Sequence, residues 1–236
     1  GHRALAVIKR VVARLREAFP HCALELRADS GLALPEVYDG GEKMGLPYTI
    51  SLAKNERLKR LLEPWMEQAR ALHEETGEKA TVFAEFHYAA ETWPHERRVI
   101  AKAEVMREGE NPRFVVTNRT DSEAEGLYRH YCQRGDPENR IKELKEGLRA
   151  DRLSCHHFWA NQFRLLLYGA AYVLCQAMRA LLEGTELGTA QVSRLRQSLL
   201  KVGARVRQSV RRVLVQLPTS YRWFHLWPCL IRAVPA

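Results

Sequence analysis

The sequence predicts an α/β protein with an open sheet, a β-rich insertion and a basic C-terminal segment. Two observations lead to this prediction. Between residues 2 and 53, segments with helical spacing alternate with strand-like segments, which is the element order of an open α/β sheet. Three strand-like segments then follow with no helix-length segment between them, which is typical of an antiparallel meander.

The N-terminal part predicts helix, strand, helix and strand, in that order, at residues 2–19, 22–26, 35–40 and 48–53. The first helix carries apolar side chains at helical spacing and ends at Pro20. Pro35 suits the first turn of the second helix, which Gly40 and Gly41 close or interrupt.

The middle and C-terminal elements are also defined by their spacing. A helix is predicted over residues 59–76, and it is followed by strands at 81–88, 97–105 and 113–118. Helical spacing returns from about residue 123 to about residue 182. The alternating pattern of residues 203–217 predicts a basic surface hairpin.

Charge is distributed unevenly along the chain, whose net charge is +9. From Leu187 to the end there are nine basic residues and no Asp or Glu, so the preceding 28 basic residues balance the 28 acidic ones. A basic segment on a neutral body favours a polyanion such as DNA. A solvated surface is equally consistent with charge alone. The candidate DNA-binding residues in the hairpin are Arg205, Arg207, Arg211 and Arg212.

Several features favour a cytoplasmic protein without a membrane partner. The longest uncharged stretch, residues 165–178, is shorter than the roughly 20 residues that cross a bilayer and is expected to be a buried helix. The N-terminus does not resemble a signal peptide. The five cysteines contain no CxxC pair, so a disulfide framework is not expected.

Four polar residues have a distinctive spacing: Tyr131, Arg134, Glu138 and Lys145. On a single helix they would lie within an arc of roughly 60°. Spacing alone favours an ordinary charged helix. Gly-Asp-Pro at 135–137 predicts a break, with the aspartate as N-cap and the proline at the first helical position, so that Glu138 begins its own helix.

This spacing resembles the Tyr-(2)-Arg-(3)-Glu-(6)-Lys signature of DDE-type transposases of bacterial insertion sequences. The strand-terminal segment LRADSG is similar to the one that carries the family's second catalytic aspartate. The resemblance covers most of the chain and implies that Asp29 and Glu138 are catalytic. Without it, Asp29 would be assigned to a turn or a helix cap.

The resemblance implies an RNase H-like fold that is incomplete at its N-terminus. Residues 1–58 would carry the second aspartate, and residues 59–122 would form the insertion. Residues 123–186 would carry the glutamate, and residues 187–236 the basic segment. The family's first aspartate has no counterpart in this sequence, so this chain alone is expected not to cut DNA.

The implied chemistry is phosphoryl transfer with two Mg²⁺ or Mn²⁺ ions held by Asp29 and Glu138, because hard carboxylate oxygens suit these ions. Tyr131, Arg134 and Lys145 would contact DNA phosphates. The implied partner is double-stranded DNA at transposon ends and target, bound by a homodimer in the bacterial nucleoid.

Two alternatives remain open from the sequence: a non-catalytic DNA-binding remnant of a transposase, and another RNase H-like nuclease. Aromatic residues of the insertion, Trp93 and the pair His87-Tyr88, could stack on DNA bases or form the core of the meander.

Overall fold

A mixed sheet forms the centre of the first of two units, which divide after Arg134; the computed structural model describes residues 2–232. The strands are β1 (Leu26–Ala28), β2 (Tyr48–Leu52), β3 (Ala80–Tyr88), β4 (Arg97–Met106), β5 (Gly109–Glu110) and β6 (Arg113–Thr117). Their order is β1-β2-β6-β4-β3, with β5 beside β4. Among these strands, the β1–β2 pair is parallel and the other pairs are antiparallel. Because β2 pairs with β6, the predicted meander strands and the two N-terminal strands share one sheet.

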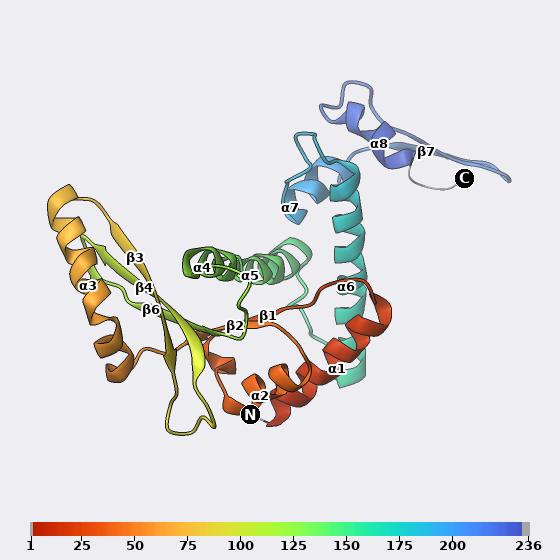
Figure 1. The fold of residues 1–236 in the computed structure, drawn as a ribbon. Helices are drawn as coiled ribbons and strands as arrows, with labels where there is room; N and C mark the ends of the chain where they lie inside the picture. The colour runs from red at the N-terminus through yellow and green to blue at the C-terminus, as the bar shows by residue number, and fades with distance from the viewer. Residues whose placement is uncertain (1, 233–236) are drawn as a thin grey trace. The chain divides into compact units, whose positions relative to one another are not determined.

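Helices cover both faces of this sheet. They are α1 (His2–Ala18), α2 (Pro35–Lys43), α3 (Glu56–Thr76) and α4 (Ala124–Cys132). Because side chains alternate along a strand, Val99 of β4 packs in one buried cluster with Leu62 of α3, whereas Ile100 packs in another with Leu127 of α4. Helices α3 and α4 therefore lie on opposite faces, and Figure 1 shows α3 running along β3 and β4.

The first strand begins later than its sequence predicts. Pairing starts at Leu26, which lies opposite Tyr48, rather than at Cys22. The Leu26 amide donates to the carbonyl of Pro47 at 2.8 Å. Since proline has no amide proton to donate, the ladder does not extend beyond this point, and the predicted strand 22–26 shifts to 26–28.

The expectation that Gly40 and Gly41 end the second helix is wrong, because α2 continues to Lys43. Both glycines are buried where a neighbour approaches closely. A Cβ at Gly40 would overlap Leu5 of α1, and one at Gly41 would lie 3.0 Å from the Tyr48 ring. These glycines therefore permit helix and strand packing instead of ending the helix.

The second unit begins at Gly135 and consists mainly of helices. They are α5 (Gly135–Lys142), a π-helical turn (Glu143–Gly147), α6 (Phe158–Leu181), α7 (Val192–Leu195), a second π-helical turn (Arg196–Leu200) and α8 (Trp227–Ile231). Its core contains Leu182, Leu187, Leu195 and Leu226. The predicted hairpin is confirmed as β7 (Arg205–Gln208) and β8 (Val213–Gln216).

Helix α6 is not the buried helix that its composition predicts. Of its residues only Cys175 is buried, while Phe158, Trp159 and Leu174 are more than half exposed. The helix packs on α7, α8 and the first π-helical turn along one stripe, which leaves the rest of its apolar surface uncovered. Within residues 2–232, no helix combines the length and apolarity needed to cross a membrane.

Candidate active site

Asp29 lies directly after β1, at the carboxyl end of the parallel β1–β2 pair. It caps a 3₁₀ turn, Ser30–Leu32, and its Oδ1 atom accepts a hydrogen bond from the Gly31 amide at 3.0 Å. Its side chain is 57% exposed. The cap holds the carboxylate in place while most of its surface remains open to a ligand.

Two residues of the signature meet this aspartate from more than 100 positions away. The Arg134 Nη2 atom lies 3.0 Å from Oδ2 of Asp29, and the Tyr131 hydroxyl donates to the Ala28 carbonyl at 3.3 Å. Tyr131 is on α4, and Arg134 is in the turn that follows it. The structure thus brings together three of the residues that the sequence singled out.

Further polar contacts fasten α4 to β1. The Arg27 guanidinium donates to the His130 carbonyl at 2.8 Å, and Nε2 of His130 lies 2.6 Å from a Glu25 carboxylate oxygen. Arg119 donates to the same carboxylate at 3.3 Å. These contacts were not predicted from the sequence, although the period-two spacing of Glu25, Arg27 and Asp29 indicates that the three residues share one side of the strand.

Glu138 is exposed in the first turn of α5, as the predicted break requires. The helix begins at Gly135, two residues earlier than an N-cap at Asp136 with Pro137 as the first helical residue would place it. Pro137 therefore lies within the first turn, where a missing amide proton costs no helical hydrogen bond.

No single helix carries the whole signature, in agreement with the predicted break. The chain turns at Gln133–Arg134, and Lys145 belongs to the π-helical turn after α5. Each interruption changes the angular phase of the following residues, because a π-helical turn has more residues than an α-helical one. Lys145 and Glu138 both lie in the second unit and are exposed.

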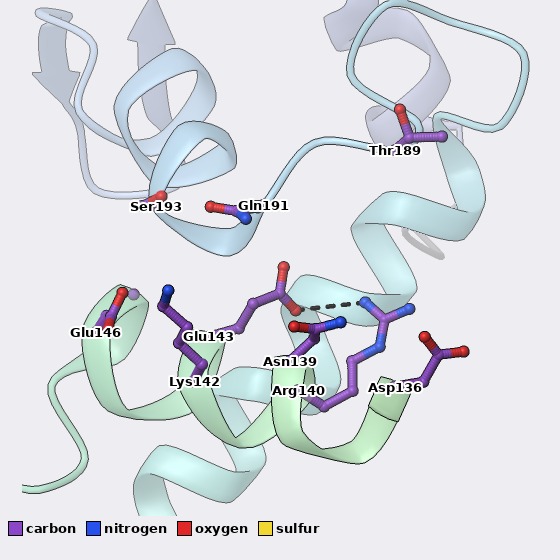
Figure 2. Close-up of a pocket in the computed structure, with 10 residues that line it drawn as sticks. Asp136, Asn139, Arg140, Lys142, Glu143, Glu146, Thr189, Gln191 and Ser193 are labelled. Atoms are coloured by element: carbon purple, nitrogen blue, oxygen red, sulfur yellow. Dashed lines mark hydrogen bonds and ion pairs between the residues drawn. The ribbon is translucent and has the colours of Figure 1, made fainter. Parts of the chain in front are cut away.

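A polar pocket of about 340 Å³ opens beside α5 in the second unit (Figure 2). Its lining includes Asp136, Asn139, Arg140, Lys142, Glu143, Glu146, Thr189, Gln191 and Ser193. Figure 2 shows that these side chains come from α5, the π-helical turn, the segment before α7 and α7 itself. The lining mixes both charge signs and does not include Glu138, so it does not select one class of ligand.

Glu143 is the most enclosed acid of this pocket, with 9% of its side chain exposed. It accepts hydrogen bonds from Arg179 at 2.8 Å and from the Tyr172 hydroxyl at 3.0 Å, and Arg140 lies 3.4 Å away. Burial raises the pKa of Glu143. The hydrogen bonds and the nearby positive charges lower this pKa by more, so its net value lies below the ordinary range. Glu143 therefore joins α6 to the π-helical turn as a charged group.

A second acidic cluster, Asp39, Glu42 and His95, has ligand atoms close enough to hold a metal ion. However, Arg97 is 2% exposed at its side chain and pairs with Asp39 at 2.5 Å and Glu42 at 2.8 Å. Burial raises the pKa of Glu42, yet hydrogen bonds from Arg97 and Tyr48 lower it overall. Because the buried Arg97 already pairs with both carboxylates, the cluster fits a structural ion-pair network better than a cation site.

The aromatic residues proposed to stack on DNA belong partly to the core. Trp93 packs edge-on against Tyr38, with ring centroids 5.1 Å apart, and against Tyr88 at 5.5 Å. Tyr88 is buried, whereas His87 is exposed. For Trp93 and Tyr88, the meander-core interpretation is the one that the packing favours.

The chain matches a family model described as transposase DDE domain group 1 over residues 1–234. The chain belongs to this family. As a DDE transposase it is related to enzymes that act on DNA with divalent metal ions. No match was found among curated proteins or solved structures.

Proposed function

We propose that Asp29 and Glu138 are metal-binding catalytic residues of this DDE transposase, within an RNase H-like core that cleaves and joins DNA. The observation that carries the proposal is the meeting of Asp29, Tyr131 and Arg134 at the end of β1. Asp29 was chosen from the resemblance of the LRADSG segment, and Tyr131 and Arg134 were chosen from the signature, which lies about 100 positions later in the chain.

The carboxylate of Asp29 fits the requirements of a ligand for a hard divalent ion. Each oxygen accepts one hydrogen bond, from Gly31 or from Arg134, and a carboxylate has roughly four acceptor positions in total. Positions therefore remain for a cation. The Asp39–Glu42 pair differs, because both of its carboxylates are held by a buried arginine.

Mg²⁺ or Mn²⁺ bound to these carboxylates would supply charge neutralisation at the attacking and leaving oxygens of phosphoryl transfer. The chain's own residues have supporting roles. Arg134 orients the Asp29 carboxylate, and it adds a fixed positive charge for a DNA phosphate. Tyr131 holds α4 against β1 and thereby positions the turn that contains Arg134.

The test is metal-dependent nicking of duplex DNA taken from the sequence that flanks the gene. Because this chain alone is expected not to cut DNA, the assay uses the polypeptide extended upstream as far as the gene encodes it. Asp29→Asn and Glu138→Gln should each abolish nicking. Asp136→Asn is the matched control, since it neutralises an exposed acid of the same first helical turn as Glu138. It should retain most of the activity.

A metal-contact test complements this result. Glu138→Cys should recover nicking with Mn²⁺ but not with Mg²⁺, because a thiolate is a poor ligand for Mg²⁺. Full activity of Glu138→Gln in Mg²⁺ would overturn the assignment. DNA binding without nicking under any of these conditions would favour a non-catalytic DNA-binding protein.

A further inference from the structure

The hairpin β7–β8 has two faces of different chemistry. Strand register pairs Arg205 with Gln216 and Arg207 with Leu214, and it pairs Val206 with Val215. Directly paired residues of an antiparallel ladder point to the same side, and the side alternates along each strand. Arg205 and Arg207 therefore share one face with Leu214 and Gln216, and we call this the arginine face.

The opposite face is apolar. It carries Val206, Val213 and Val215, together with Gln208, and these valines are 56–64% exposed. The strand arginines therefore lie on one face and none lies on the other, a difference that the basic composition of the segment did not reveal.

The turn extends the arginine face. The Ser209 amide donates to the Arg212 carbonyl at 2.8 Å, which continues the pairing by one step beyond Gln208 and Val213. Alternation then places Arg212 on the same side as Arg207. Arg211 lies in the turn beside Val210 and is exposed. Sequence composition treated all four arginines alike, whereas the register assigns three of them to one face.

We propose that this arginine face binds the phosphates of duplex DNA, so that the hairpin is a DNA-backbone contact of the transposase. The inference rests on the proposed action on DNA. Every residue of the ribbon strands is exposed, and no Asp or Glu follows Glu186 that could neutralise the arginines locally. Two residues along a strand span about 6.7 Å. Duplex DNA presents roughly four phosphates over that length of its axis, so Arg205 and Arg207 can each meet one.

The experiment measures binding of a non-specific DNA duplex to the full chain as a function of salt concentration. Arg205→Gln with Arg207→Gln should reduce the slope of log affinity against log salt by about 1.8, since each phosphate contact contributes about 0.9. Arg205→Lys with Arg207→Lys should keep the original slope, because charge is retained. This lysine pair separates loss of charge from damage to the hairpin.

Val206→Thr with Val215→Thr is the matched control on the opposite face, because threonine keeps the strand preference and the shape of valine. It should leave both affinity and salt slope unchanged. An unchanged slope in the glutamine pair would overturn the proposal, as would weaker binding that appears only in the threonine pair. This experiment measures DNA binding and does not require catalysis. Failure of the nicking assay can therefore be distinguished from failure of the hairpin to bind DNA.

Discussion

Replacement of Arg97 tests whether the Asp39–Glu42–His95 cluster is a structural network. The guanidinium is 2% exposed, pairs with two carboxylates and lies 5.1 Å from the Tyr38 ring centroid and 5.4 Å from that of Trp93. Arg97→Met keeps an unbranched apolar chain but removes the charge. Breaking a buried ion pair costs about 3–5 kcal/mol.

The lower end of that range applies here, because the carboxylates regain part of their hydration. Asp39 is 34% exposed and Glu42 is 28% exposed at the side chain. The expected loss is about 3 kcal/mol, which corresponds to about 100-fold faster exchange of amides that open only when the unit unfolds. Hydrogen exchange of the central β4 amides, detected by mass spectrometry, reports on this unit separately from the rest of the chain.

Arg70→Met is the matched control, since Arg70 also pairs with two carboxylates, Glu63 at 2.8 Å and Glu110 at 2.7 Å. Its side chain is 35% exposed, so the expected loss is under about 1 kcal/mol. Equal exchange rates in the two variants would refute the reasoning, because burial would then not decide the strength of the network. Stabilisation of the Arg97→Met variant by Mg²⁺ would indicate that the carboxylates can hold a cation once the arginine is removed.

Three other outcomes are expected. Burial raises the Glu104 pKa, but bonds from Lys102 and other donors lower it to about 2. The ionised Glu104 therefore stabilises the fold fully above the unfolded pKa of about 4.3, and this stabilisation is lost as pH falls toward 2. In acid unfolding, the difference in unfolding free energy between Glu104→Gln and the parent protein should shrink over that pH window. Glu143→Gln should destabilise the second unit by about 2–4 kcal/mol, seen as faster α6 exchange, because it leaves the Arg179 charge, 12% exposed, without its carboxylate. Arg134→Gln should change unfolding free energy by under about 1 kcal/mol yet reduce DNA nicking at least tenfold; equal effects on both would contradict a role in positioning.

Local spacing in the sequence predicted most of the elements, whereas the candidate site residues came from a family resemblance. The meander strands were predicted within one residue of their ends, and the hairpin 203–217 encloses both observed ribbon strands. Periods of 2 and 3.6 residues follow from backbone geometry alone, so they can be read without knowledge of the partners. Tyr131 and Arg134 were singled out differently, by resemblance to a family signature, because their spacing alone favoured an ordinary charged helix.

Tertiary structure decided everything that depends on which distant segments meet. Contact between Asp29 and Arg134, the pairing of β2 with β6, and the burial of Arg97 between two aromatic rings all join positions far apart in sequence. Strand order and register come from long-range packing, which no local period encodes. The start of β1 at Leu26 has the same origin, because a proline on the neighbouring segment, 21 residues later, ends the ladder.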